Sequence, residues 1–183
     1  GSPRISITGS NAGIVRASPG VTITATGAQI NTYEQGAFTM EDGDDFAGSD
    51  VYARDGGIIT NAGPQTLASV QVFGTDINTG SPSTYTANAP LTITGSEFGG
   101  GTLDVGYGGV FHANANVTVP GVSVYGGTLD LVSGTLAVGE SLNVSGSTAS
   151  VTRAPGAVIS APTAFVQVSG LASFTMEASD TSV

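Results

Sequence analysis

A short repeated unit between Gly126 and Val151 constrains the fold more than any other feature of this sequence. The stretch GGTLDLVSGTLAVGESLNVSGSTASV repeats an apolar-x-apolar unit every six or seven residues, and little besides Gly and Ser separates the units. Strands this short cannot bury a core alone, so each must share one with its neighbours. The repeat therefore favours a fold in which short strands stack on one another.

Equivalent apolar residues return at nearly constant spacing within this stretch. Leu129, Leu136, Leu142 and Ala149 occupy matching places, and steps of 7, 6 and 7 residues bring the pattern back after 20. Antiparallel sandwiches and barrels instead favour hairpin turns at intervals of about 8 to 12 residues. Short strands with small corner residues are typical of stacked coils with parallel pairing. The sequence therefore predicts an all-β parallel β-helix, or β-solenoid, with three faces and about 20 residues per coil.

Short alternating runs continue along the chain, and helical patterns are almost absent. The runs are β-branched and bounded by Gly, Asn, Ser or Pro, as short strands are; they are Ile5–Ile7, Val21–Thr24, Phe38–Met40, Val70–Val72, Leu91–Thr94, Val117–Val119, Val122–Val124 and Val166–Val168. Such coils, stacked at the strand spacing, would number roughly nine. We expect residues 1–183 to form a single solenoid domain, with the clearest repeats at 91–168 and loops projecting near 39–51 and 79–89.

The composition argues against several classes of partner. All four basic residues are arginines, and fourteen carboxylates bring the formal net charge to −10. Such a surface repels phosphate backbones and anionic lipids, which argues against nucleic-acid and membrane-surface partners. The sequence has no cysteine, which excludes disulfides and thiolate metal sites. No stretch approaches the roughly 20 apolar residues of a membrane helix, so we expect no membrane insertion and an extracellular protein.

The two ends of the chain suggest how the segment is used. It begins with Gly1-Ser2-Pro3 and has no charged-then-apolar leader, so we expect a piece of a larger extracellular protein. A solenoid whose terminal coils lack a cap exposes unpaired strand edges. Unless residues 1–10 or 180–183 cover those coils, we expect end-to-end or trimeric self-association.

Three copies of a glycine-led unit carry a resemblance to known proteins. GGTLDL at Gly126–Leu131, GGTLDV at Gly100–Val105 and SGTLAV at Ser133–Val138 resemble the Gly-rich repeats of bacterial autotransporter passenger domains and filamentous haemagglutinin-like surface proteins. The resemblance implies a secreted or cell-surface β-helix that serves as a stalk or adhesin. Phage tail fibres, tailspikes and polysaccharide lyases share the architecture, and the fold alone does not decide among these functions.

The densest charge of the sequence lies in MEDGDDFAGSD. Five acids fall within ten residues: Glu41, Asp42, Asp44, Asp45 and Asp50. Clustered carboxylates suit Ca²⁺, which takes six to eight oxygen ligands. The spacing does not match an EF-hand, because Phe46 stands at the third ligand position. Two interpretations therefore stay open, a calcium site and a solvated acidic loop.

Two acids and two tyrosines form the second candidate site. Asp104 and Asp130 hold equivalent places in the two GGTLD units, and they would stack on one face about one coil apart if the six extra residues between the units form a loop. With Tyr107 and Tyr125 they would make a glycan platform, because aromatic rings stack on sugars and acids bind hydroxyls. The same two acids would be the carboxylate pair of a glycoside hydrolase. Ordinary packing between strands is the other explanation of the tyrosines, and the simpler one.

These features predict a non-catalytic structural or adhesive segment of a bacterial cell-surface or secreted protein, which presents loops to a host or environmental surface or to a glycan. It requires no cofactor, and Ca²⁺ is the ion that its acids would suit. The alternative is a phage tail fibre or tailspike segment, or a carbohydrate-active β-helix of the lyase or hydrolase kind. An enzyme needs acids that converge in a cleft, whereas a stalk needs only uninterrupted stacking.

Overall fold

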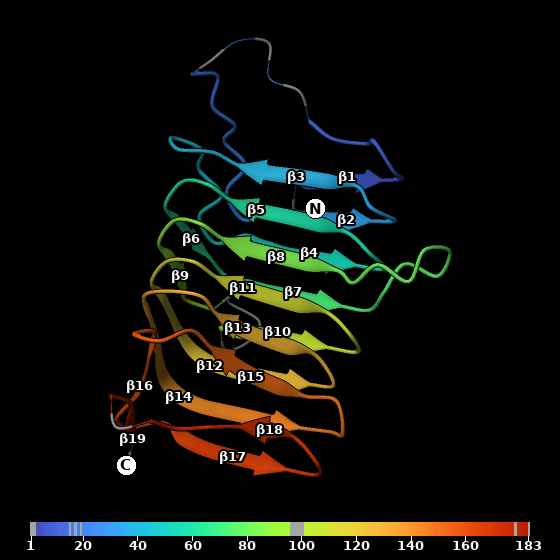
Figure 1. Cartoon of the computed structure of the whole chain (residues 1–183). Coiled ribbons are helices and arrows are strands. Elements are labelled where there is room, and N and C mark those ends of the chain that lie inside the picture. The colour runs from blue at the N-terminus through green and yellow to red at the C-terminus, as the bar shows by residue number, and fades with distance from the viewer. Residues whose placement is uncertain are drawn as a thin grey trace.

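The chain folds as a stack of similar coils. The computed structural model describes residues 3–14, 16, 18, 20–95, 101–177 and 179–182. They form about seven coils of roughly 22 residues, and this described part of the chain contains strands but no helix. Each coil lies on the previous one, so the colour changes steadily from one end of the stack to the other (Figure 1). The predicted β-solenoid is confirmed.

Each coil has three faces, and their strands form two parallel sheets along the stack, because faces one and three are joined into one sheet and face two is the other. Face one consists of β1 (Arg4–Thr8), β2 (Gln29–Tyr33), β4 (Asp50–Arg54), β7 (Ser69–Phe73), β10 (Thr102–Gly106), the second half of β12 (Val117–Tyr125), the second half of β14 (Thr135–Ser145) and β17 (Phe165–Ser169). The strands β12 and β14 are long because they turn the corner between faces three and one. Their register shifts between Val119 and Gly121, where the chain bends.

The other two faces close the coil. Face two consists of β3 (Ala37–Met40), β5 (Ile58–Asn61), β8 (Thr84–Ala87), β11 (Val110–Ala113), β13 (Thr128–Leu131), β15 (Ser150–Arg153) and β18 (Ser173–Phe174). Face three consists of β6 (Gln65–Leu67), β9 (Leu91–Ile93), the first halves of β12 and β14, β16 (Val158–Ala161) and β19 (Thr181–Ser182). The three faces enclose one continuous apolar interior.

Alternation within each strand builds the core. Val51, Val70, Leu103, Val122 and Leu142 stand one above another on face one, because parallel pairing brings equivalent residues into register. All five are at most 1 % exposed. Burying a side chain of this size contributes roughly 1.5–3 kcal/mol. Every coil thus stabilises its neighbours through such columns, as expected for a repeat fold.

Face two contributes an aromatic column to the same core. The rings of Tyr85 and Phe111 stack at 5.1 Å between centroids, with only 5° between their planes. Burial raises the pKa of Tyr85, and its hydroxyl has no hydrogen-bond partner among the described residues. Tyr85 is therefore a core residue of the stack.

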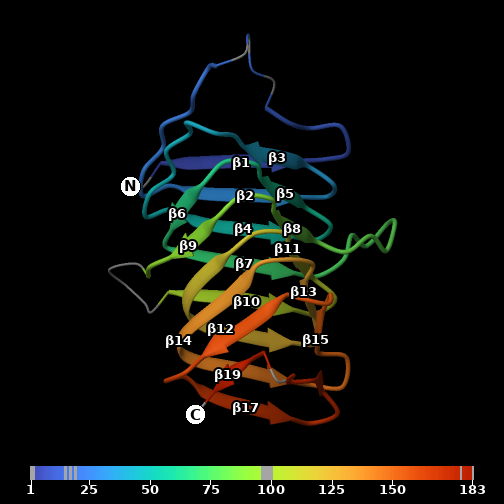
Figure 2. The ribbon, with the colours of Figure 1, turned by 60° about the vertical axis from the view of Figure 1, so that its left-hand side comes forward.

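The loops differ from the simple expectation. Residues 74–83, between β7 and β8, project from the stack (the green loop in Figures 1 and 2). The expected loop at 79–89 overlaps this projection but also contains β8, which is paired on both sides. The expected loop at 39–51 stays in the stack, where Asp45 pairs in parallel with Thr24. Roughly nine coils of about 20 residues were expected, and about seven coils of roughly 22 residues are present. The difference arises because each coil is longer and because connections between strands take up part of the chain.

Candidate functional site

Three aromatic side chains from successive coils meet at the end of face one. Phe73 ends β7, Tyr107 follows β10 and Tyr125 ends β12. The ring centroids of Phe73 and Tyr107 are 6.2 Å apart, and those of Tyr107 and Tyr125 are 5.2 Å apart at 74°. Tyr107 is 67 % exposed and Tyr125 is 49 % exposed. We call these three residues the aromatic ladder.

The backbone at this corner fixes how the ladder is presented. Tyr107 has φ +51°, a left-handed conformation that side chains rarely adopt, and its N–H donates to the carbonyl oxygen of Tyr125 at 2.9 Å. A Cβ on Gly106 would lie 2.5 Å from the Phe73 ring, so any larger residue there would push that ring away from the strand. The ladder geometry therefore depends on one residue in a left-handed conformation and on one glycine.

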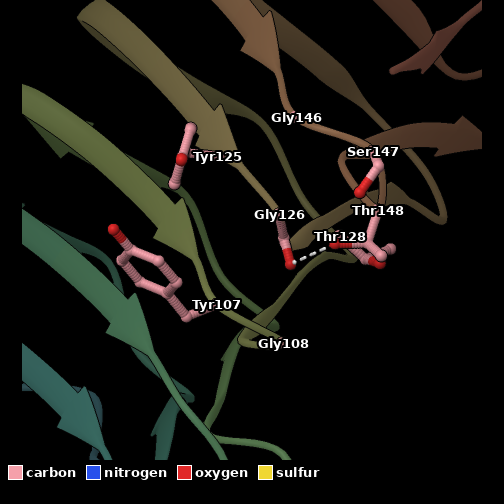
Figure 3. Close-up of a pocket in the computed structure, with 8 residues that line it drawn as sticks. All are labelled: Tyr107, Gly108, Tyr125, Gly126, Thr128, Gly146, Ser147 and Thr148. Carbon is pink, nitrogen blue, oxygen red and sulfur yellow. Dashed lines mark hydrogen bonds between the residues drawn. The ribbon is translucent and has the colours of Figure 1, made fainter. Parts of the chain in front are cut away.

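The ladder borders a surface hollow of about 510 Å³. Figure 3 shows Tyr107 and Tyr125 on one side of it and the hydroxyl groups of Ser147 and Thr148 on the other. The Thr148 hydroxyl donates to the carbonyl oxygen of Gly126 at 3.2 Å, which ties two successive corners together. The full lining comprises Tyr107, Gly108, Tyr125, Gly126, Thr128, Gly146, Ser147 and Thr148.

A column of polar side chains runs beside the ladder on the outward side of face one. Strand register places Asn31, Tyr52, Gln71, Asp104 and Ser123 at equivalent positions in consecutive coils. Burial raises the pKa of the Asp104 carboxyl, although a hydrogen bond from the Thr102 hydroxyl opposes this rise. Face one thus combines exposed rings with a row of hydrogen-bonding groups.

One cation reinforces this column. The Arg54 guanidinium lies 4.6 Å from the centre of the Tyr52 ring, a cation–π contact. Its Nη2 also donates to the Gln71 side-chain oxygen at 3.0 Å. Arg54 therefore holds two neighbours of the column in fixed positions.

The expected stacking of Asp104 on Asp130 is wrong. Asp104 belongs to β10 on face one, and Asp130 belongs to β13 on face two. The Asp130 carboxylate lies 3.2 Å from His112 Nδ1 and accepts the Thr152 hydroxyl at 2.9 Å. The two GGTLD units are thus used on different faces, so Tyr107, Tyr125 and Asp104 share face one whereas Asp130 lies elsewhere.

The acidic segment contains an internal anchor. Asp44 has a fully buried carboxylate that pairs with the Arg16 guanidinium at 2.6 Å, and Glu41 pairs with Arg16 Nε at 2.9 Å. The same Asp44 carboxylate accepts the backbone N–H groups of Ile23 and Glu41. The hydrogen bond with Asp44 is the largest cause that raises the pKa of Arg16. We call Arg16, Glu41 and Asp44 the N-terminal clamp.

The remaining acids of this segment point to separate partners. Asp45 accepts the N–H of Ala47, and Asp50 accepts the hydroxyl of Ser69 at 2.6 Å. Asp42 is exposed. In the described ranges, no three His, Cys, Asp or Glu side chains come together as a group able to hold a metal ion.

A second clamp, which the sequence reasoning missed, lies at the other end of the stack. Arg153 pairs with the buried carboxylate of Asp180 and with Glu177. Asp180 also accepts the N–H of Ile159 at 2.9 Å and that of Glu177 at 2.8 Å. We call Arg153, Glu177 and Asp180 the C-terminal clamp. The signal that could have revealed it is the motif FTMExxD, which occurs at 38–44 and again at 174–180.

Phe73 was also missed as a member of the candidate site. It ends a strand that reads like any other alternating run, so local pattern does not distinguish it. Only the pairing of Phe73 with Gly106 in the neighbouring coil brings it to the ladder.

Comparison with known proteins adds no relative to this picture. No family model, curated protein or solved structure matches the chain. Within the described residues there is also no helix long and apolar enough to cross a bilayer. The geometry of the chain itself is therefore the basis for assigning a function.

Proposed function

We propose that this chain is a non-catalytic adhesive segment of a bacterial cell-surface or secreted protein, and that it contacts glycans through face one. The observation that carries the proposal is the aromatic ladder, in which rings from three successive coils meet and two tyrosines remain largely exposed. Aromatic faces stack on the apolar faces of sugar rings, and the shallow hollow beside the ladder is lined by rings and hydroxyls.

Polar groups beside the ladder supply the second half of a glycan site. The hydroxyls of Ser147 and Thr148 lie across the hollow, and the Asp104 carboxyl lies in the adjoining polar column. Such groups donate to and accept from sugar hydroxyls. The net charge of −10 and the scarcity of cations favour neutral glycans over polyanionic ones.

The non-catalytic part of the proposal rests on the position of the two candidate acids. Hydrolysis of a glycosidic bond uses two carboxyl groups about 5–9.5 Å apart that flank the bond. Asp104 and Asp130 lie on different faces, and Asp130 is occupied by His112 and Thr152. The extracellular, bacterial part rests on the resemblance of the glycine-led units and on the acidic composition.

A glycan array tests the proposal. The purified chain is applied to immobilised neutral and acidic glycans, with Ca²⁺ and with chelator, and any bound glycan is then incubated with the chain in solution. We expect selective binding without cleavage, and loss of binding in the double variant Tyr107→Ala/Tyr125→Ala. The matched control is Phe165→Ala, because Phe165 is exposed to the same extent (66 %) but lies outside the ladder. Cleavage of a bound glycan, or equal binding by the double variant, would contradict the proposal.

A further inference from the structure

The rings of the aromatic ladder repeat with the period of the coil. Phe73, Tyr107 and Tyr125 come from β7, β10 and β12, which are successive neighbours in one sheet. Their centroids are 6.2 Å and 5.2 Å apart, and paired strands are spaced at about 4.8 Å. The distance between neighbouring sugars in a glycan chain is similar. The ladder therefore offers one ring per coil, at a spacing that suits one sugar per ring.

Each strand of the ladder also presents a hydrogen-bonding side chain shortly before its ring. These side chains are Gln71, Asp104 and Ser123, and strand pairing aligns them in one row that runs beside the rings. All three are half-buried, so each keeps a part that solvent can reach. A sugar that rests on a ring can exchange hydrogen bonds with the matching member of this row. Rings and row both follow the stack, which favours a ligand that lies along the stack axis and not across it.

The flanking coils limit the length of the platform. The positions that match Phe73 and Tyr125 in those coils hold Arg54 and Ser145, so neither continues the series of rings. Arg54 is engaged by the Tyr52 ring and by Gln71. On the other side, the hydroxyls of Ser147 and Thr148 line the hollow beside Tyr125 (Figure 3). Three rings and one hydroxyl-bearing corner give room for about four sugars.

The planes of the three rings are inclined to one another. The angle is 40° between Phe73 and Tyr107 and 74° between Tyr107 and Tyr125. A sugar that stacks on an aromatic ring has its mean plane nearly parallel to that ring. Successive sugars on the ladder must therefore be inclined as the rings are. Since Tyr107 and Tyr125 are both largely exposed, each has ring surface available for such contact.

This inclination distinguishes between classes of glycan. A β-1,4-linked glucan is a flat ribbon in which successive ring planes are nearly parallel, so it can stack on only one ring of the ladder at a time. The α-1,4- and β-1,3-linked glucans are helical, and their ring planes turn at each linkage. Only a chain of the helical kind can present inclined sugars to inclined rings.

We propose that the aromatic ladder binds a single helical glycan strand, which lies along the stack axis with one sugar per coil. The inference rests on the glycan-binding function proposed above, and it adds the shape, direction and length of the ligand. Phe73, Tyr107 and Tyr125 each carry one sugar, and the corner of Ser147 and Thr148 carries the fourth.

The first test is calorimetric titration of the chain with malto-, laminari- and cello-oligosaccharides, which are α-1,4-, β-1,3- and β-1,4-linked, each with two to six sugars. In at least one of the two helical series we expect the affinity to rise with each sugar up to four and then to level off. Cellohexaose should bind at least tenfold more weakly than the better helical hexasaccharide.

Other outcomes overturn the inference in distinguishable ways. Equal or tighter binding of cellohexaose would show that the site takes a flat ribbon. An affinity that no longer rises beyond the disaccharide would show that it takes a chain end only. In both cases the chain still binds glycans, so the proposed function stands. Absence of binding in all three series would overturn the inference too, and a blank glycan array in addition would remove the function on which it rests.

A variant that lengthens the ladder provides the second test. Ser145→Tyr places a fourth ring in the coil after Tyr125, because these two positions pair in register. We expect about fivefold tighter binding of the helical tetra- and hexasaccharides, with a smaller gain for the disaccharide. The matched control is Ser6→Tyr, which adds a ring at an exposed position of β1, outside the ladder. Equal affinities of Ser145→Tyr and the wild type at every length would overturn the inference, and circular dichroism shows whether both variants fold.

Discussion

Residues 4–44 and residues 141–180, which we call the first copy and the second copy, align with a single gap at Ser18, and they differ in what lies on them. Phe38 is buried beneath the coil of residues 45–67, whereas its counterpart Phe174 lies in the last described coil and is half-buried. Burial in this molecule therefore belongs to the pair of neighbouring coils and not to the segment alone. Stability should then be nearest-neighbour in character, as in other repeat proteins.

The same comparison separates the two Gly-Ser corners. Gly9-Ser10 of the first copy lies beside the projecting segment 74–83, in a polar hollow that includes Asp76. Gly146-Ser147 of the second copy lies beside the aromatic ladder. One corner sequence is thus combined with two kinds of neighbour, and only the second corner offers exposed rings. This contrast is why we place the glycan site there.

Removal of one aromatic ring should have the largest effect and should differ between the copies. Phe38→Ala leaves a cavity in the closed core, so we expect it to lower the free energy of unfolding by about 4 kcal/mol. Phe174→Ala removes a half-buried ring from the last described coil and should cost less than half as much, roughly 1–2 kcal/mol. Urea denaturation of both variants measures the difference, and equal losses would contradict a nearest-neighbour core.

Removal of the clamp aspartates should have the next largest effect. Asp44→Ala leaves two backbone N–H groups without their acceptor and leaves Glu41 as the only acid on Arg16, which should cost about 3 kcal/mol. Asp180→Ala breaks the same bonds in the terminal coil, and we expect local fraying with less than about 1 kcal/mol of global loss. The exposed Asp42→Ala is the control and should stay within about 0.5 kcal/mol. A global loss at Asp180 equal to that at Asp44 would show that the end coil is as cooperative as the interior.

Acidification should act on the first corner and not on the second. The backbone N–H of Asn78 is the largest cause that lowers the pKa of Asp76, and Thr79 and Gln35 also donate to this carboxylate. Since the folded pKa lies below the unfolded one, the carboxylate stabilises segment 74–83 above the usual aspartate pKa of about 3.9, and that stability is lost as pH falls through the folded pKa.

Amide proton shifts of Asn78 and Thr79 during an NMR pH titration report this loss. We expect a midpoint below the usual aspartate range and no corresponding transition at Ser147 or Thr148. The variant Asp76→Asn should abolish the titration at Asn78 and Thr79. A midpoint at or above the usual range would contradict the hydrogen-bonded carboxylate.

Calcium should have the smallest effect. Glu41 and Asp44 recur as Glu177 and Asp180 and are engaged in clamps, whereas Asp42 corresponds to Ala178. We therefore expect millimolar Ca²⁺ to shift the thermal midpoint by less than about 1 °C. A site with a Kd 100-fold below the calcium concentration would instead add about 2.7 kcal/mol of stability. An increase of that size, reversed by chelator, would restore the calcium interpretation.

The period of the sequence was sufficient to predict the fold class but not the length of the coil. The spacing among Leu129, Leu136 and Leu142 gives the number of residues from one face of the coil to the next. Any fold with short strands shows a similar spacing, so it does not give the length of a whole coil. Insertions such as residues 74–83 carry no signature that separates them from corners of Gly, Ser and Pro. The length of a coil depends on how many residues each connection between faces contains. Only the pairing of strands in the structure shows which residues belong to a connection.

The candidate site shows the same limit in more detail. The two GGTLD units look interchangeable, yet Gly106 ends the first one on face one while the second runs along face two. The local sequence does not show on which face a strand lies, because that depends on the number of residues in each preceding corner. Tyr107 and Tyr125 do meet, at 5.2 Å, but Phe73 and the clamps need contacts between residues far apart in the chain. Comparison of 4–44 with 141–180 was the sequence signal that could have predicted the clamps.

Affinity measurements check whether face one binds glycans through the aromatic ladder. The best glycan from the array is titrated into the wild type, Tyr107→Ala and Phe165→Ala, whose replaced rings are equally exposed. We predict that Tyr107→Ala weakens binding at least about tenfold, or 1.4 kcal/mol, while Phe165→Ala leaves the Kd unchanged. Equal affinities for the wild type and Tyr107→Ala would show that the aromatic ladder is not the glycan site.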